Sequence, residues 1–275
     1  MESNDLSVVI VTYRSENKIF SCLDSIPGEI DVIVVENSNN EEFKKLIEQK
    51  YSNVKCILAN ENLGYARGNN IGLKQVTTKY ALVLNPDARL EKNCVSIFLD
   101  TAKKFQDFWL IGPANNQTDF RANSEEFEVD NLKGFAIFFN IQKFNNSFFD
   151  ENFFLYFEEI DLCKKVKIKK GKIILSKNIK INHEGSGSVD KNNINEFEKN
   201  RNWHWMWSTF YYHKKYKGFL IALIIIMPKF ITSIIKIFLY QLTFNNKKRN
   251  IYFSRMSGII NSILGRKSWY RPSLD

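Results

Sequence analysis

Apolar and polar positions alternate along the first third of the chain in a repeating pattern. Short runs rich in β-branched apolar residues predict buried strands, and the stretches between them have helical spacing. Strand and helix in regular alternation predict a mainly parallel, doubly wound α/β sheet. The predicted strands are residues 6–13, 31–37, 54–60 and 80–87, and the predicted helices lie near residues 16–26, 40–50 and 64–76.

Every one of these predicted strands ends in polar residues. The fourth, ALVLNPDARL, stops at Asn85, Pro86 and Asp87. The carboxyl ends of parallel strands meet at one edge of a sheet, where open α/β folds bind their ligands. Asp87 is therefore a candidate metal ligand. It would share one crevice with the ends of the other strands, which are Thr12 and Tyr13, Glu36 and Asn37, and Asn60 and Asn62.

The segment NENLGYARGNN, residues 60–70, follows the third strand. Gly64 lies at a predicted helix start, where unpaired backbone amides and the helix dipole attract anions. Arg67 would add a positive charge for a phosphate, and Asn62 and Asn85 are further candidates for ligand binding. Neither GxxxxGK[ST] nor GxGxxG is present. The alternative is an asparagine-rich turn that only caps the helix.

Acidic residues crowd behind an aromatic run in FDENFFLYFEEIDLC, residues 149–163. Glu158, Glu159 and Asp161 are poorly solvated next to aromatic bulk, which raises the pKa of a carboxyl group and suits it to act as a base. The alternative is that these acids favour the dipole of the helix that follows. Further strands are predicted at residues 134–140 and, as a pair, within residues 173–182.

His183 opens the segment HEGSGS, whose small residues would close over phosphates and a metal. A structural role is the alternative for a single histidine. His204 and His213 lie in the aromatic stretch RNWHWMWSTFYYHKKY, which is typical of helix packing and membrane-interface contact.

Composition and charge indicate the number of domains, the cellular compartment and the kind of partner. The chain has 275 residues, 44% hydrophobic and 25% charged, which predicts one large domain with an appendage. The four cysteines include no CxxC pair and no apolar signal region opens the sequence, so we expect a reducing cytosol. The net charge of +9 calls for an acidic partner, and no nucleic-acid-binding signature is present, which favours a membrane surface.

An apolar segment at residues 219–242 lies between clusters of basic residues. It has about the 20 residues that span a bilayer, but Pro228, Lys229 and Lys236 interrupt it, and charges at that depth are costly. We expect a pair of short interfacial helices on the inner leaflet of the cell membrane. The alternatives are an apolar hairpin packed on the catalytic domain or on a second subunit of a homo-oligomer, and a true span.

Taken in order, VVIVTYRS, VVENSN, NENLGYARGNN, LVLNPDARL, FDENFFLYFEEIDL, HEGSGS and RN before an aromatic helix resemble the family 2 glycosyltransferases. The rhamnosyltransferase-like members that build bacterial surface polysaccharides are the most similar. The resemblance covers about residues 6–215. It implies a GT-A fold, a nucleotide diphosphate sugar donor, a divalent metal (Mg²⁺ or Mn²⁺) and inversion. We therefore expect a glycosyltransferase domain at 1–215, with a nucleotide-binding half at 1–100 and an acceptor and catalytic half at 101–215. The apolar and basic pattern of residues 216–275 predicts a helical, membrane-associating C-terminal region.

The resemblance assigns roles to single residues. Glu159 takes the position of the catalytic base, although the family more often has Asp there and at Glu36, so the role could shift to Glu158 or Asp161. NPD replaces a two-aspartate motif. The remaining matches are Thr12 and Tyr13, which hold or stack on the base, Glu36, which reads the base or ribose, Asp87, which takes the metal-binding position, and His183, near metal and diphosphate.

These expectations combine into one function. The sequence predicts an inverting, metal-dependent glycosyltransferase, cytoplasmic and peripheral on the membrane, acting on a glycan or a lipid-linked saccharide without nucleic acid. Two alternatives are a membrane-associated nucleotide-sugar binding protein without turnover and a sugar nucleotidyltransferase. The nucleotidyltransferase alternative is weakened because no glycine-rich loop follows the first predicted strand, where this chain has VTYRSEN.

Overall fold

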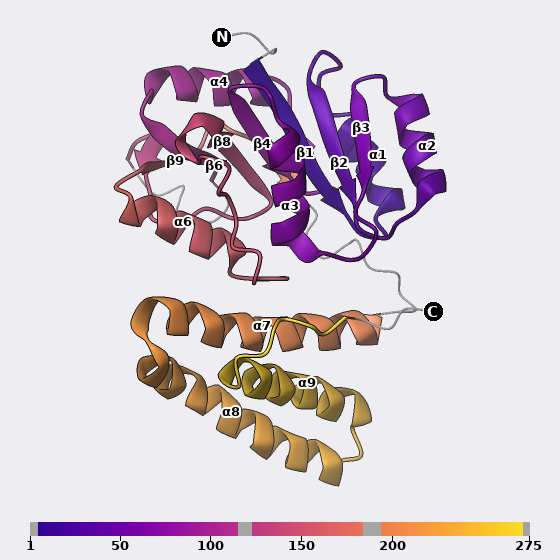
Figure 1. Cartoon of the computed structure of the whole chain (residues 1–275), viewed down its shortest axis with the longest axis vertical. Helices are drawn as coiled ribbons and strands as arrows, with labels where there is room; N and C mark the ends of the chain where they lie inside the picture. The colour runs from indigo at the N-terminus through magenta and orange to yellow at the C-terminus, as the bar shows by residue number, and fades with distance from the viewer. Residues whose placement is uncertain (1–4, 115–122, 184–193, 272–275) are drawn as a thin grey trace. The chain divides into compact units, whose positions relative to one another are not determined.

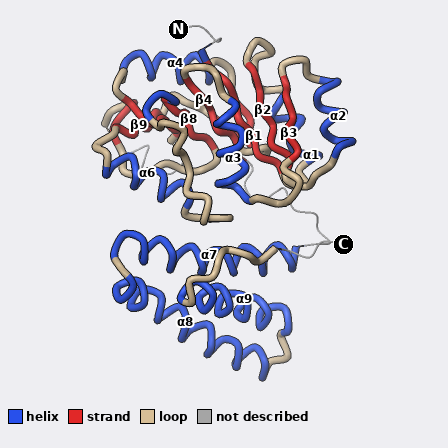
Figure 2. Tube along the Cα trace, in the orientation of Figure 1, coloured by secondary structure: helices blue, strands red, loops and turns tan. Residues whose placement is uncertain are grey.

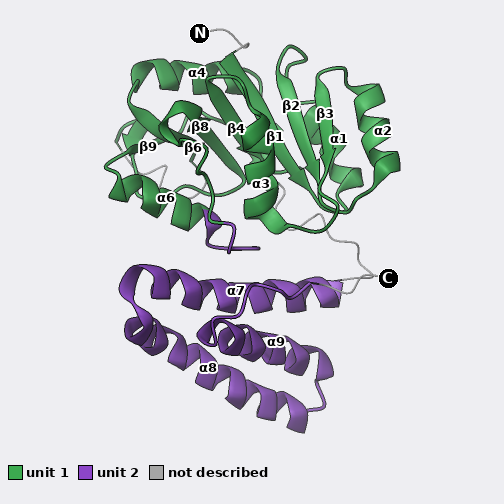
Figure 3. Ribbon diagram, in the orientation of Figure 1, with its two compact units in different colours: residues 1–150, 159–188 green, residues 151–158, 189–275 purple. Residues whose placement is uncertain are grey.

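The computed structural model describes residues 5–114, 123–183 and 194–271 (Figure 1). Helices and strands mix in the first part of the chain, and helices alone build the last part (Figure 2). The chain divides into two compact units (Figure 3). The first contains residues 1–150 and 159–188, and the second contains residues 151–158 and 189–275.

The first third of the chain has the strands and helices that its pattern predicts. Asn40 caps the second helix, because its side chain accepts a hydrogen bond from the Phe43 amide at 3.0 Å, and Glu41 and Glu42 occupy the first turn. The elements are β1 (Leu6–Thr12), α1 (Glu16–Leu23), β2 (Asp31–Glu36), α2 (Glu41–Lys50), β3 (Val54–Leu58), α3 (Gly64–Gln75) and β4 (Tyr80–Leu84).

The rest of the first unit adds shorter elements. They are β5 (Ala88–Leu90), α4 (Cys94–Lys104), β6 (Phe108–Pro113), β7 (Glu126–Glu128), β8 (Ala136–Asn140), the 3-10 turn η2 (Ile141–Lys143), α6 (Glu158–Ile168), β9 (Lys172–Ser176) and β10 (Ile181–His183). The predicted strand pair within residues 173–182 is wrong. β9 pairs with β6 and β7, whereas β10 pairs with β5, because the chain leaves the large sheet after Ser176.

The large sheet has eight strands in the order β3-β2-β1-β4-β8-β6-β9-β7. All are parallel except β8 and β7, so the predicted mixed, mainly parallel sheet is confirmed. The strand order reverses between β1 and β4, because β2 and β3 lie on one side of β1 and β4 on the other. Such a switch point opens a crevice outside the carboxyl ends of the strands.

Alternate residues along the strands face two separate cores, as the two-residue period of a strand requires. Val8 and Ile10 join one core, with residues of α1, α2 and α4. Val9 joins the other, with residues of α3 and α6. Helices therefore cover both faces of the sheet. All four cysteines are free and buried.

Helix α3 lies unusually close to β1. A Cβ atom added to Gly68 would come within 2.8 Å of Val11, and one added to Gly72 within 2.4 Å of Val9. Because such distances are shorter than any carbon contact allows, only glycine permits this approach. Gly68 therefore serves helix packing, and Gly64 remains the glycine at the helix start.

The second unit is built mainly from three helices, α7 (Ile194–Lys217), α8 (Phe219–Leu242) and α9 (Asn246–Ile263). Met206, Phe210, Ala222, Ile226 and Ile259 form its core. Helix α7, which the sequence prediction assigned to a domain ending at residue 215, thus packs with α8 and α9 in this unit.

The predicted pair of short helices at residues 219–242 is wrong, because α8 runs unbroken through Pro228. Packing of Ala222 and Ile226 before the proline and of Ser233 after it outweighs the one backbone hydrogen bond that proline removes. In the described part of the chain, α8 is one helix with the length and apolar composition to cross a membrane, and 17% of its most apolar window is buried.

Candidate active site

Asp87 lies just beyond the end of β4, on the turn that leads into β5. The Asn85 amide donates to the Phe135 carbonyl at 2.8 Å, and the Ala88 amide donates back to the Asn85 carbonyl at 3.0 Å. These two bonds hold the turn against the chain that enters β8. The side chain of Asp87 is 8% exposed.

His183 is the nearest polar partner of Asp87. The pairing of β10 with β5 places His183 opposite Ala88, and the Nε2 atom of His183 lies 3.2 Å from Oδ1 of Asp87. The imidazole stacks on Phe135, with ring centroids 4.6 Å apart and planes 10° apart. Burial opposes ionisation of Asp87, but the hydrogen bond and charge of His183 outweigh it, so the pKa of the carboxyl lies below its ordinary value.

A small cavity of about 140 Å³ adjoins this pair. The charge of Lys18, on α1, also favours the ionised form of Asp87. The cavity is lined by Asn17, Lys18, Ser21, Cys22, Asp87, Ala88, Arg89 and Asn182.

The three acids of α6 have different environments. Asp161 is fully buried, 3.9 Å from Nζ of Lys165, and Glu158 is also buried. Glu159 is partly exposed, and burial raises the pKa of its carboxyl although the helix amides and Lys133 act in the opposite direction. A base must reach its substrate. Of the three, Glu159 is the one that is partly exposed, so it best meets this requirement.

Gly134 lies near Glu159, and the next residue, Phe135, lies against His183. The Tyr65 hydroxyl donates to the Gly134 carbonyl, and a Cβ added to Gly134 would lie 3.6 Å from Cβ of Glu159. The next residue, Phe135, stacks on His183. One short segment therefore lies beside the proposed base and stacks on His183 of the Asp87–His183 pair. Sequence reasoning missed Tyr65, Gly134 and Phe135, because their roles depend on the antiparallel pairing of β8 with β4.

Thr12 and Tyr13 end β1 at the switch point. Thr12 is buried, and its hydroxyl has no hydrogen-bond partner among the described residues. Tyr13 is half-buried. The Asn37 amide donates to the Thr12 carbonyl at 2.9 Å, which joins the ends of β1 and β2.

Glu36 is fully buried at the end of β2. Its Oε1 accepts from the amide of Ser38 at 2.8 Å and from the Ser38 hydroxyl, and its Oε2 accepts from the Asn40 amide at 2.7 Å. Both oxygens therefore stabilise the turn into α2. The predicted contact of Glu36 with a base or ribose stays a prediction.

The start of α3 matches its predicted shape. Gly64 has φ of 76°, its amide donates to Oδ1 of Asn62 at 3.1 Å, and its carbonyl accepts from Nδ2 of Asn37 at 3.3 Å. Arg67 is exposed one turn later. The asparagines thus build the turn, and Arg67 lies on the exposed side of the helix.

Asp87 and His183 supply a carboxylate oxygen and an imidazole nitrogen at one place. Over residues 5–114, 123–183 and 194–271, no group of three or more His, Cys, Asp or Glu side chains is arranged to hold a metal ion. A two-ligand site fits a cation whose other ligands are substrate phosphates and water. The segment after His183, residues 184–188, which was predicted to close over phosphates, lies outside the described residues.

His204 has a structural environment, as its aromatic surroundings predict. Its Nε2 lies 2.8 Å from the Tyr270 carbonyl oxygen and its Nδ1 lies 2.9 Å from the Ser268 hydroxyl. Burial lowers the pKa of His204 to about 3, so this imidazole is neutral.

Two solved structures are similar to this one over nearly its whole length. The mannosyltransferase PcManGT from Pyrobaculum calidifontis, determined with GDP-Man and Mn²⁺, has a TM-score of 0.62 at 12% identity over 96% of this chain and 88% of its own. S. aureus TarS 1-349 has a TM-score of 0.56 at 14% identity over 97% and 93%. These likenesses show the fold and confirm the predicted GT-A class.

Residues 7–163 match the model of glycosyl transferase family 2. Because they make up more than half of the chain, the protein belongs to this family. It is 27% identical over 193 residues to the low-salt glycan biosynthesis hexosyltransferase Agl10 of Haloferax volcanii, covering 60% of this chain and 62% of that one. It is 28% identical over 154 residues to a teichoic acid poly(glycerol phosphate) polymerase of Staphylococcus epidermidis, covering 53% and 20%. The chain thus spans less than two thirds of either relative.

Proposed function

We propose that this protein is an inverting, metal-dependent glycosyltransferase. It would move a hexosyl or deoxyhexosyl group from a nucleotide diphosphate donor to a hydroxyl of a growing cell-surface glycan or a lipid-linked saccharide. The observation that carries this proposal is Glu159, a partly exposed carboxylate with a raised pKa, joined through Gly134 and Phe135 to the Asp87–His183 pair. Family membership supports the same reaction class.

Glu159 accepts the proton of the acceptor hydroxyl as that oxygen attacks the anomeric carbon. A placed base contributes about 10² to 10⁴ in rate. The nucleoside diphosphate leaves from the opposite face of the sugar. One displacement inverts the anomeric configuration, so no second carboxylate nucleophile is needed, unlike in retaining glycosidases.

Asp87 and His183 would hold the divalent metal. When bound, Mg²⁺ or Mn²⁺ neutralises charge that develops on the leaving diphosphate. Arg67 and the amides at the start of α3 add positive potential for the same phosphates. The mannosyltransferase neighbour determined with GDP-Man and Mn²⁺, and TarS determined with UDP, support a nucleotide donor of this kind.

The activity would take place on the cytoplasmic face of the membrane. Large apolar side chains of α8 are exposed along one side, spaced three or four residues apart: Leu220, Ile224, Met227, Ile231, Ile235, Phe238 and Leu242. This spacing makes one helical stripe. We refer to these seven residues as the apolar stripe of α8. It supports docking on lipid, with a second copy of the chain as the alternative partner.

A donor screen tests the function. Purified protein is incubated with UDP, dTDP and GDP sugars with Mn²⁺ or Mg²⁺, and released nucleotide is measured. We expect one donor class to release nucleoside diphosphate only with metal. Formation of nucleoside triphosphate and sugar 1-phosphate when pyrophosphate is added would instead identify a nucleotidyltransferase, and donor binding without any release would identify a binding protein.

A further inference from the structure

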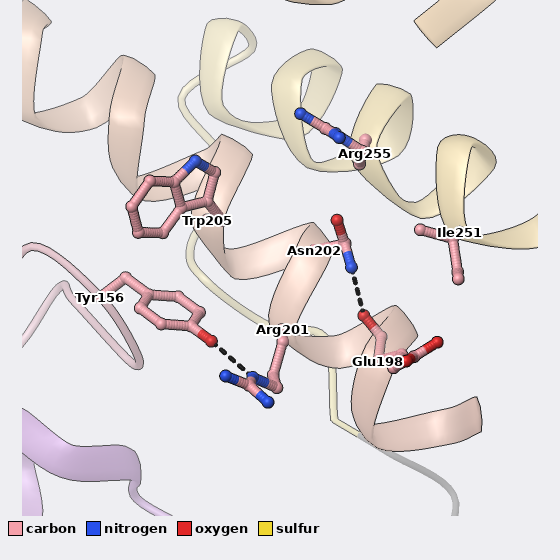
Figure 4. A pocket seen from close by; sticks show the side chains of 7 residues that line it. All are labelled: Tyr156, Glu198, Arg201, Asn202, Trp205, Ile251 and Arg255. Carbon is pink, nitrogen blue, oxygen red and sulfur yellow. Dashed lines mark hydrogen bonds between the residues drawn. The ribbon is translucent and has the colours of Figure 1, made fainter. Parts of the chain in front are cut away.

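The helical unit contains a pocket of about 450 Å³ that shares no residue with the strand-end site (Figure 4). Its volume is within the range of about 300–1,000 Å³ that small-molecule sites occupy. Its walls come from α7, from α9 and from the segment that precedes α6. The lining residues are Tyr156, Glu198, Arg201, Asn202, Trp205, Ile251 and Arg255.

Two arginines give the pocket a positive lining. The Nε atom of Arg255 is buried and has no hydrogen-bond partner within the described residues. The Nε atom of Arg201 donates to the Tyr156 hydroxyl at 2.7 Å (Figure 4). A guanidinium carries five N–H donors, so both side chains keep donors for a ligand.

The described lining of the pocket contains these two cations and one acid. The one acid of the lining, Glu198, lies 3.7 Å from Nζ of Lys247 and so has a cation of its own. Burial and then the charge of Arg255 lower the pKa of Lys229 on α8, so another cation lies near Arg255. Arg255 is partly buried, and an anion in the pocket would offset the cost of burying its charge.

The aromatic wall adds an apolar surface beside the charges. Trp205 is 42% exposed, and its ring meets Tyr156 edge to face, with centroids 5.1 Å apart. Tyr156 and Phe157 both have left-handed backbone, with φ of 69° and 70°. Such backbone is costly for bulky residues and persists only where contacts hold it. Here the Arg201 bond holds Tyr156 as a fixed wall of the pocket.

We propose that this pocket binds the phosphoryl group of a lipid-linked saccharide, with Arg201 and Arg255 on the phosphate and the first sugar against Trp205. Arginine matches phosphate oxygens with paired hydrogen bonds, and an exposed indole packs against the apolar face of a sugar ring. The ligand would be the acceptor substrate, so this inference rests on the proposed glycosyltransferase function.

The same helical unit favours a lipid-linked source over a soluble one. The apolar stripe of α8 is exposed, and Lys229 on that helix lies near Arg255. An exposed apolar helix surface binds lipid, and nearby lysines add attraction to anionic headgroups. A phosphate that is attached to a lipid would be presented there.

Vesicle binding tests the pocket without requiring turnover. Phosphatidylcholine vesicles carry a polyprenyl diphosphate monosaccharide, an uncharged polyprenyl glycoside, or phosphatidylglycerol at matched charge. We expect wild-type protein to prefer the first. Arg255→Gln and Arg201→Gln should each weaken that binding about 10- to 100-fold, as expected for lost hydrogen bonds to a charged group. Arg249→Gln removes the same charge from α9 outside the pocket and should retain the preference.

A further variant separates phosphate from sugar recognition. Trp205→Ala should weaken binding to vesicles with the diphosphate monosaccharide more than to vesicles with polyprenyl diphosphate alone. Circular dichroism melting checks that each variant is folded. Arg255→Gln and Arg201→Gln proteins that are folded and keep the wild-type preference would overturn the proposal. Equal binding to phosphatidylglycerol, or pyrophosphate binding without vesicle preference, would overturn the lipid-linked saccharide as ligand.

Donor hydrolysis by the wild-type protein separates this inference from the proposed function. If no donor is hydrolysed but the arginine-dependent vesicle preference is present, the proposed function fails and the phosphoryl site stands. If donor is hydrolysed and the vesicle preference does not depend on Arg201 or Arg255, the pocket proposal fails alone.

Discussion

Glu36 ends β2 and Asp87 follows β4 at the same edge of the sheet, yet their carboxylates have different hydrogen-bond partners. The oxygens of Glu36 accept hydrogen bonds from Ser38 and Asn40 in the turn that follows β2. Asp87 instead lies against His183, which comes from a different strand pair. One acid stabilises its own turn, and the other forms a potential metal site with a distant residue.

The acids of α6 show the same contrast. Asp161 is fully buried near Lys165, whereas Glu159, two residues earlier, is partly exposed and has a raised pKa. Acids that lie close together in the sequence can therefore differ in their hydrogen bonds and exposure, and these differences indicate which acid can act on a substrate. We refer to Glu159 and Asp87, the proposed base and metal ligand, as the open acids, and to Glu36 and Asp161, which have no proposed role in the reaction here, as the closed acids.

The largest effect should come from Glu159→Gln. We expect sugar transfer to fall about 10²- to 10⁴-fold, because the acceptor hydroxyl loses its base, while donor affinity stays within a few-fold. Stopped transfer assays and donor titration measure the two quantities. Glu91→Gln, at an exposed acid of the same unit, is the control and should keep wild-type rates. Near wild-type transfer by a folded Glu159→Gln protein would exclude Glu159 as the base.

Asp87→Asn should have the next largest effect. The amide keeps the shape but loses the negative charge that would hold the metal, so we expect a loss of about 10²- to 10³-fold in turnover. Part of it should be recovered at higher Mn²⁺ concentration. Asp107→Asn removes an exposed acid that is paired with Lys172 and should change little. An unchanged metal requirement in Asp87→Asn would place the metal elsewhere.

A smaller effect, on stability, should distinguish the closed acids. Glu36→Gln should lower the free energy of unfolding by about 1–3 kcal/mol, because the buried amides of the turn lose a charged acceptor. Denaturant unfolding measures this, with Glu42→Gln, an exposed acid of α2, as the control. If stability is unchanged and the donor KM rises instead, Glu36 contacts the donor as the sequence resemblance implies.

The smallest effect should be on how the free energy of unfolding depends on pH, and it should come from Glu159. Because burial raises its folded pKa above the ordinary value of 4.5, the folded state holds its proton more tightly than the unfolded state. Stability therefore falls as the pH rises from about 4.5 through the folded pKa. Glu159→Gln removes this loss, so the variant should be more stable than wild type at neutral pH and similar below pH 4.5. An equal difference at both pH values would argue against a raised pKa.

The sequence predicted the first four strands well, because their β-branched runs are long and end in turn-forming residues. It failed where a partner lies far along the chain. β5 and β10 have three residues each, too few for a periodic signal, and their pairing brings Asp87 to His183. Pro228 also misled the prediction, since packing on both sides keeps α8 helical.

The sequence identified candidate residues more readily than the contacts that their side chains make. The polar strand ends indicated Asp87 and Glu36 alike, because local sequence does not show which turn amides bond a carboxylate. The resemblance assigns the base to Glu159 with Glu158 and Asp161 as alternatives, and the three side chains differ in their burial. Tyr65 and Gly134 had no sequence signal, since a hydroxyl and a backbone carbonyl meet only after the sheet is formed.

The pH dependence of transfer, measured as kcat/KM for the acceptor, tests the central claim most directly. A base with a raised pKa must lose its proton before it can act, so the rate of wild-type protein should fall toward low pH with an apparent pKa above 4.5. In Glu159→Gln protein, the residual rate should lack this acidic limb. An identical acidic limb in both proteins would contradict the assignment of Glu159 as the base.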